Sequence, residues 1–186
     1  MKQLLILITA LLVLAGCANR EPQPDYADLT ETWAFSGKMA VRNAREASSF
    51  NVDWVQSQAD FEIELSGPLG QGRVEVAGRP GRVTLRQGDD VWRARSLTEL
   101  GQRLADMNLP LDHLQYWVRG RASPRDIGTL TLDNQGRLTR LQQSGWTVSF
   151  PSYYGEGADA LPRRIDFERD DSSGRLVIRN WLADAS

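Results

Sequence analysis

The feature that most constrains this chain is an alternation of apolar and polar residues that recurs along most of its 186 residues. A period of two is typical of strands with one face buried and the other in water. Short turn signals separate the alternating segments, as in antiparallel sheets joined by hairpins. We predict about eleven strands from this pattern. They cover residues 33–42, 50–54, 61–65, 73–76, 83–86, 90–95, 127–132, 137–143, 146–150, 163–169 and 175–182.

Two helices are predicted to interrupt the alternation in the middle of the chain. Ser96 and Glu99 match a capping box, and leucines at helical spacing follow, so we predict a helix over residues 97–107. Residues 110–118 predict a second helix, with Pro110 near its first turn. An antiparallel sheet of so many strands must curl or close. Because both helices are apolar on one side, we expect them to pack on the concave face of the sheet.

The first residues are expected to direct export and anchoring. Lys2 precedes an apolar run over residues 4–13, which is typical of a signal peptide and too short for a retained membrane helix. Cys17 is the only cysteine, so it cannot form an internal disulfide, and it follows Leu-Ala-Gly. This tetrapeptide resembles the lipobox of bacterial lipoproteins, which implies cleavage before Cys17 and acylation of that residue. The expected parts are a signal peptide (1–16), an acylated cysteine with a flexible tether (17–28) and a single domain (29–186).

The composition argues against several kinds of chemistry. A formal net charge of −2 gives no support for nucleic-acid binding. His113 is the only histidine and no carboxylate cluster has metal-ligand spacing, so we expect no metal and no cofactor. The sequence contains no nucleophile elbow, phosphate-loop motif or dinucleotide fingerprint. The glycines of residues 67–72 are not a phosphate cradle either, because they join two predicted strands and do not open a helix. We therefore expect the protein not to be an enzyme, and His113 to be a surface or cap residue.

Six tryptophans are the most informative part of the composition. They fit ordinary core packing, because each indole buries a large area. They also fit the lining of a wide apolar cavity for a lipid-like ligand. The alternating pattern does not separate these two interpretations, since the same inward face serves a filled core or a hollow one.

Several short motifs follow one another along the chain. They are Trp33-x-Phe35-x-Gly37-Lys38-x-Ala40-Val41, Trp54, Gly67-Pro68-Leu69-Gly70, Leu109-Pro110 with Trp117-x-x-Gly120, Gly145-Trp146-x-Val148, and Trp181. Each motif is weak alone, but their order and spacing are specific. Together they resemble the LolB family of outer-membrane lipoprotein receptors, over essentially the whole mature chain.

The resemblance implies an incomplete antiparallel β-barrel with helices over its opening and an apolar cavity inside. It implies a receptor that is lipid-anchored in the outer membrane and faces the periplasm. Such a receptor accepts lipoproteins from the soluble carrier LolA and inserts them into the inner leaflet. The implied partners are therefore LolA, acylated lipoprotein cargo and outer-membrane lipid, and we expect a monomer. Ala18 fits this location, because an aspartate after the cysteine is the usual signal for inner-membrane retention.

Two sets of site residues are predicted. Pro68 suits the second position of a tight turn that pushes Leu69 outward. The family places a membrane-directed leucine in this protruding loop, so Gly67, Pro68, Leu69 and Gly70 form the predicted membrane-directed loop. The predicted cavity lining takes inward positions of the strands and the apolar sides of the helices. It consists of Trp33, Phe35, Met39, Phe50, Val52, Trp54, Phe61, Ile63, Leu65, Leu97, Leu100, Leu104, Trp117, Trp146, Val148 and Phe150.

Two other functions remain open at this point. The first is an outer-membrane-anchored carrier of lipid or another hydrophobic ligand, which needs no protein donor. The second is a structural or assembly lipoprotein, whose tryptophans only fill a core. Uptake of cargo from LolA would separate the receptor from the first alternative, and a lipid-sized cavity would argue against the second.

Overall fold

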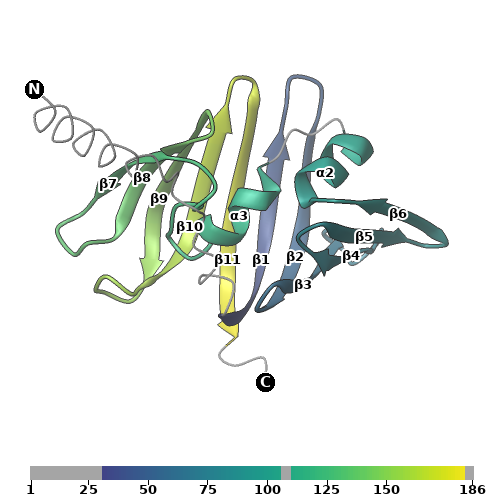
Figure 1. The fold of residues 1–186 in the computed structure, drawn as a ribbon, viewed down its shortest axis with the longest axis horizontal. Helices are drawn as coiled ribbons and strands as arrows, with labels where there is room; N and C mark the ends of the chain where they lie inside the picture. Colours follow the sequence, from purple (N-terminus) through teal and green to yellow (C-terminus); the bar gives the residue numbers. More distant parts are fainter. Residues whose placement is uncertain (1–30, 106–109, 183–186) are drawn as a thin grey trace, which may run out of the picture.

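Eleven antiparallel strands form one open sheet, which confirms the fold expected from the alternation (Figure 1). The structure is a computed structural model that describes residues 31–105 and 110–182, with only the backbone described for residues 102–105. The predicted signal peptide and tether, including Cys17, lie outside the described residues. The strands are β1 Thr32–Arg42, β2 Ala47–Ser57, β3 Asp60–Ser66, β4 Val74–Arg79, β5 Arg82–Gln87, β6 Asp90–Ala94, β7 Gly128–Leu132, β8 Leu138–Gln143, β9 Trp146–Tyr154, β10 Leu161–Arg169 and β11 Ser172–Leu182.

The sheet consists of two meanders joined by the first and the last strand. Strands β1 to β6 pair in sequence order, and strands β7 to β11 do the same. Strand β1 pairs antiparallel with β11, which makes one sheet of the order β6-β5-β4-β3-β2-β1-β11-β10-β9-β8-β7. The two helices cross the sheet on one side, as Figure 1 shows. The first and last strands of the chain therefore lie at the middle of the sheet, while β6 and β7 are its edges.

Alternation along the strands gives the sheet one apolar and one polar face. In β2, Val52, Trp54 and Gln56 are buried, whereas Asp53 and Val55 between them are exposed. The inward side chains of the other strands join them in one continuous apolar cluster on the concave face. Burying one large apolar side chain contributes roughly 1.5–3 kcal/mol. This cluster is therefore the main source of stability for the fold.

Helix α2 (Leu97–Ala105) begins where the capping box predicts. The Glu99 backbone N–H donates to Ser96 Oγ at 3.0 Å and so satisfies one of the open donors at the helix start. The Glu99 carboxylate accepts the backbone N–H of Arg95 at 2.9 Å, one residue before the position that a capping box uses. The predicted helix end at residues 106 and 107 lies outside the described residues.

Helix α3 (Leu111–Trp117) lies across the concave face and also supports α2 (Figure 1). Its Leu114 and Trp117 side chains are 1% and 0% exposed. The Asp112 carboxylate accepts the backbone N–H groups of the first two residues of α2, at 3.2 and 3.1 Å. Because these donors have no partner inside α2, Asp112 supplies the partners that they need. Both helices therefore pack on the concave face, as predicted.

Candidate functional site

The predicted lining residues come together on the concave face of the sheet. Trp33, Phe50 and Leu65 are half-buried and pack against the central apolar cluster. The side chain of Leu104 lies outside the described part of the chain. The other predicted lining residues are buried in the cluster itself: Phe35, Met39, Val52, Trp54, Phe61, Ile63, Leu97, Leu100, Trp117, Trp146, Val148 and Phe150.

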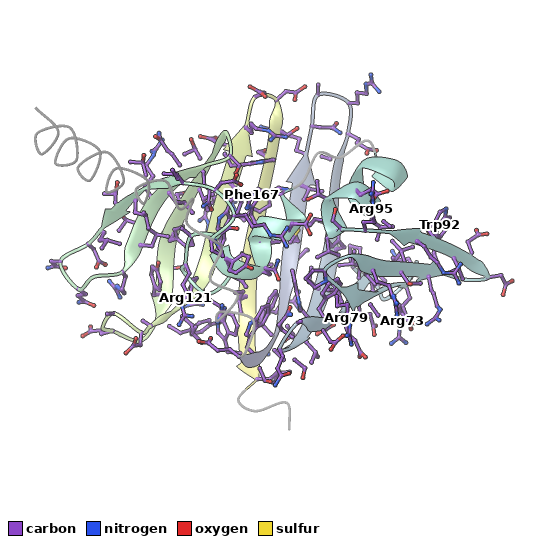
Figure 2. All side chains as sticks on the ribbon, viewed as in Figure 1. Arg73, Arg79, Trp92, Arg95, Arg121 and Phe167 are labelled. Atoms are coloured by element: carbon purple, nitrogen blue, oxygen red, sulfur yellow. The ribbon has the colours of Figure 1, made fainter. Side chains whose placement is uncertain are left out.

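Side chains of α3 fill the space that the concave face encloses. Leu114 and Trp117 of α3 and Val118 just after it are almost fully buried. The ring centroids of Trp117 and Phe167 are 6.4 Å apart, and Figure 2 labels Phe167 beside α3. A hollow of about 830 Å³ lies instead on the opposite, polar face, where Asp166 is among its lining residues. On the concave side a hollow of only about 160 Å³ lies beside the helices, with Phe61, Val83 and Leu97 among its lining residues. A large apolar ligand therefore needs α3 to move before it can enter.

Four aromatic rings meet where β1, β2 and β11 lie side by side. The centroids of Trp33 and Trp54 are 5.6 Å apart, and those of Phe35 and Trp181 are 5.4 Å apart. The indole N–H of Trp54 donates to Gln56 Oε1 at 3.2 Å. Trp33 and Trp181 are only half-buried. The apolar cluster therefore reaches the protein surface at this group of rings.

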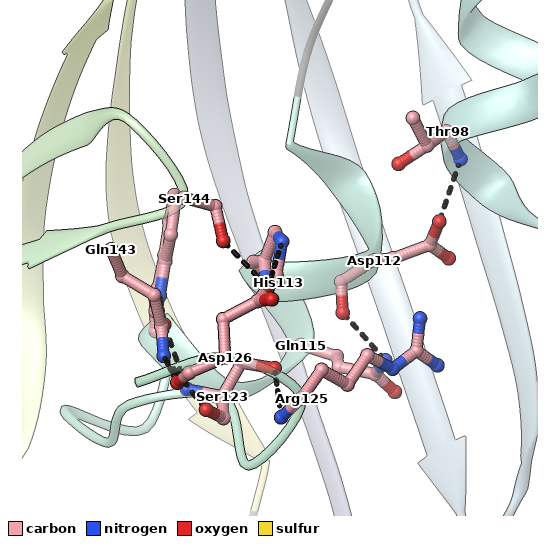
Figure 3. A network of polar contacts seen from close by, with 10 residues as sticks. Thr98, Asp112, His113, Gln115, Ser123, Arg125, Asp126, Gln143 and Ser144 are labelled. Atoms are coloured by element: carbon pink, nitrogen blue, oxygen red, sulfur yellow. Dashed lines mark hydrogen bonds and ion pairs between the residues drawn. The ribbon is translucent and has the colours of Figure 1, made fainter. Parts of the chain in front are cut away.

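A buried glutamine, Gln143, ties α3 and the following loop to the sheet (Figure 3). Its Oε1 accepts the indole N–H of Trp117 at 3.0 Å and the backbone N–H of Ser123 at 2.9 Å. Its Nε2 donates to the backbone carbonyls of Ser123 and Asp126, both at 2.7 Å. The amide uses all of its hydrogen-bonding capacity while it is only 2% exposed. Sequence reasoning missed this residue, although a glutamine at an inward strand position was its signal.

His113 packs between α3 and the loop that contains Asp126. Its ring stacks on Trp117 with centroids 5.6 Å apart, and its Nε2 lies 3.5 Å from Asp126 Oδ2. The side chain is 16% exposed, so the expectation of a surface or cap residue was wrong. The reason is helical geometry, because Trp117 lies one turn further along the same face of α3.

Burial lowers the pKa of His113 below its usual value of 6.5. The carboxylates of Asp126 and Asp112 oppose this shift, while the guanidinium groups of Arg125 and Arg169 add to it. The buried Nδ1 has no hydrogen-bond partner among the described residues. A proton on Nδ1 would therefore be buried without an acceptor, which agrees with the direction of the shift.

This pKa predicts a loss of stability at mildly acidic pH. His113 in the unfolded chain binds a proton more readily than His113 in the folded protein. Above pH 6.5 the free energy of unfolding therefore carries no penalty from His113, and it declines as the pH falls below that value. Urea unfolding near pH 7.5 and near pH 5.5 measures this loss. In the variant His113→Phe, which keeps an aromatic ring against Trp117, the loss should be smaller. An equal loss in both proteins would contradict the assignment.

The predicted membrane-directed loop protrudes between β3 and β4. The Gly70 N–H donates to the Gly67 carbonyl at 2.8 Å, which closes a tight turn with Pro68 and Leu69 at its two central positions. Gly70 has a φ of +81°, a conformation that residues with a side chain rarely adopt. Leu69 is 92% exposed. The turn therefore directs an apolar side chain into solvent, as its sequence predicts.

The described residues contain no obvious metal centre. Within residues 31–105 and 110–182, no group of three or more His, Cys, Asp or Glu side chains is placed to hold a metal ion. No helix in the same part of the chain has the length and apolar character needed to cross a membrane.

Comparison with protein families gives one match over most of the domain. The family model described as outer membrane lipoprotein LolB matches residues 31–181. The outer-membrane lipoprotein LolB of Cellvibrio japonicus is 38% identical over 193 residues, which cover 96% of this chain and 95% of that protein. The protein of the same name from Stutzerimonas stutzeri is 35% identical over 186 residues, which cover 91% of this chain and 90% of that protein.

The fold resembles that of a LolA superfamily protein. The crystal structure of such a protein from Nitrosomonas europaea matches with a TM-score of 0.57 and 10% sequence identity. The match covers 88% of this chain and 93% of that one. At this identity the likeness concerns the architecture alone, namely an open, curled antiparallel sheet with helices on its concave side.

Proposed function

This chain belongs to the LolB family of outer membrane lipoproteins, and we propose that it receives lipoprotein cargo from the periplasmic carrier LolA and inserts it into the inner leaflet of the outer membrane. The protein is an outer-membrane lipoprotein receptor that is anchored in that membrane by lipid. The finer parts of the proposal are the identity of the donor, the acyl-binding face and the residues that act at release.

The anchor is proposed to be Cys17, exposed as the first residue after removal of residues 1–16. Stable anchoring requires two or more acyl chains, because one chain gives only marginal and reversible binding. Residues 17–28 would then join the lipid to the single domain. A fully extended segment of this length reaches roughly 40 Å at most. The domain would therefore stay close to the bilayer while it changes its orientation.

The observation that carries the acyl-binding proposal is the continuous apolar cluster on the concave face under α3. Acyl chains gain about 0.8 kcal/mol per buried methylene, so burial of a long chain offsets the cost of exposing the side chains that it displaces. We propose that acyl chains displace Leu114, Trp117 and Val118 from this face. The half-buried rings of Trp33 and Trp181 are where the cluster reaches solvent, and they offer the incoming chains a first contact.

Transfer is proposed to need no covalent chemistry. The receptor must bind cargo more tightly than LolA does and less tightly than the membrane does. Each step is then downhill in free energy, so neither a nucleotide nor a catalytic residue takes part. This is the behaviour of a binding protein rather than of an enzyme.

Leu69 is proposed to act on the membrane during release. Burial of one leucine contributes roughly 1.5–3 kcal/mol. This is much less than a multiple-chain anchor provides, so Leu69 is not needed to hold the protein at the membrane. It is sufficient to bring the loop into contact with lipid at the point where cargo leaves.

A transfer assay tests the proposed function. A complex of LolA with a triacylated lipoprotein is mixed with vesicles that carry the full acylated protein, and the cargo is followed from LolA to the protein and then to the bilayer. We expect cargo to leave LolA only when the protein is present. A general lipid carrier would bind free lipid yet leave the LolA complex intact, and this result would contradict the proposal.

A further inference from the structure

The loop that carries Leu69 is held closed by the side chain of Gln71. The Leu69 backbone N–H donates to Gln71 Oε1 at 3.1 Å, and the Gly67 N–H donates to the Gln71 carbonyl at 2.8 Å. The Gln71 side chain also folds back over Gly67, where an added Cβ would lie 2.8 Å from Gln71 Nε2. Gln71 therefore contacts the loop through its backbone and its side chain at once.

A second group of contacts fixes the base of the loop to the sheet. Asn51 of β2 donates from Nδ2 to the Gly67 carbonyl at 3.2 Å, and this carbonyl also accepts the hydrogen bond that closes the turn. Asn51 Oδ1 in turn accepts a hydrogen bond from Arg179 of β11 at 2.9 Å. Asn51 lies opposite Ser66, the last residue of β3. The orientation of the loop is thus set by side chains from two strands at the middle of the sheet.

We propose that Gln71 and Asn51 are positioning residues that hold Leu69 ready to enter the bilayer during cargo release. This inference rests on the proposed function, because it assigns a role to residues that support the loop used in that step. Neither residue needs to contact lipid or cargo. Their effect passes through the backbone of residues 67–70.

The physical basis is the entropy of the loop. Residues 67–72 include three glycines, which are free to adopt many conformations unless something restricts them. Ordering such a loop at the membrane would cost free energy of the same size as the gain from burying one leucine. A loop that is ordered beforehand avoids this cost, so the burial of Leu69 is a net gain. Loss of one supporting hydrogen bond should therefore slow release without affecting the concave face.

Two substitutions test this role. Gln71→Ala removes the acceptor for the Leu69 N–H. Asn51→Asp is nearly isosteric, keeps the acceptor for Arg179 and removes the donor to the Gly67 carbonyl. For each variant of the full acylated protein, on vesicles of phosphatidylethanolamine and phosphatidylglycerol, three quantities are measured. Uptake is measured as cargo lost from LolA, and release as cargo that no longer co-precipitates with the protein. The order of the loop is measured by hydrogen exchange at the Leu69 and Gly70 amides.

Both variants should take up cargo at the wild-type rate and release it about three- to tenfold more slowly. Exchange at the two loop amides should rise in parallel. Gln135→Ala is the matched control for Gln71→Ala, because Gln135 Oε1 also accepts a backbone N–H, that of Gly157, in a different turn. Asn180→Asp is the control for Asn51→Asp, since Asn180 is an exposed amide of β11 whose Nδ2 donates to Ser36 Oγ and not to the loop. Both controls should release cargo normally.

The outcomes separate this inference from the function on which it rests. If the wild-type protein does not take cargo from LolA, the proposed function fails. If uptake is normal and Leu69→Glu slows release, but Gln71→Ala and Asn51→Asp release cargo at the wild-type rate despite faster exchange, only the positioning role is overturned. Unchanged exchange at both loop amides would also overturn it, because the two side chains would then not order the loop.

Discussion

Replacing Gln143 with leucine is expected to lower the free energy of unfolding by about 3 kcal/mol. The substitution leaves two buried donors without an acceptor, the indole N–H of Trp117 and the backbone N–H of Ser123. It also removes the donor to the carbonyls of Ser123 and Asp126. Each unpaired buried group costs about 1–3 kcal/mol, partly offset by the apolar surface of leucine and by relaxation of the loop toward water.

Urea unfolding at neutral pH measures this effect. Gln142→Leu is the matched control, because Gln142 is the exposed neighbour on the same strand and should change stability by less than about 0.5 kcal/mol. A loss below about 1 kcal/mol in Gln143→Leu would show that the network does not hold α3 against the sheet. Such a result would also remove the reason to regard opening of α3 as a costly step in ligand binding.

Replacing Leu69 with glutamate is expected to slow delivery of cargo into vesicles at least tenfold, while folding and cargo uptake stay unchanged. The leucine side chain is 92% exposed and has no part in the core, so its loss should not affect stability. Leucine burial in lipid contributes roughly 1.5–3 kcal/mol, and its loss alone corresponds to about a tenfold to hundredfold lower rate of delivery. The added carboxylate increases the effect, because a charge enters lipid only at a cost.

Ile127→Glu is the control for this variant. Ile127 is a fully exposed apolar residue just before β7, outside the membrane-directed loop. The Ile127→Glu substitution adds the same charge to the protein surface and should leave cargo delivery intact. Normal delivery by Leu69→Glu would mean that the exposed leucine has no role in release. A comparable defect in both variants would point to a general effect of surface charge instead.

The strands and the faces of the sheet could be predicted well from the sequence, because burial of one face imposes a period of two. This pattern predicts that Val52 and Trp54 point inward, and both are buried. The chemistry of its turn predicts that Leu69 points outward, and it is exposed. These predictions rest on residues that are close together in the chain, where local geometry decides the outcome.

The contacts of α3 could not be predicted in this way. The alternation marks Gln143 as an inward residue, but its partner Trp117 lies 26 residues earlier in the chain and meets it only through the packing of α3. The alternation also cannot say whether an inward residue such as Val148 lines a cavity or fills a core. That difference depends on where α3 lies, since Leu114, Trp117 and Val118 of this segment occupy the enclosed space.

Photocrosslinking from the two faces of one strand is the most direct test of the proposal that acyl chains bind the concave face. Phe50 points inward and is half-buried on β2, whereas Val55 on the same strand points outward and is 37% exposed. A photoreactive phenylalanine analogue is placed at either position in the full protein, and a triacylated lipoprotein is delivered from LolA. We expect the acyl chains to crosslink to position 50 and not to position 55. Crosslinks of equal yield at both positions, or none at position 50 while transfer proceeds, would contradict an acyl-binding site on the concave face.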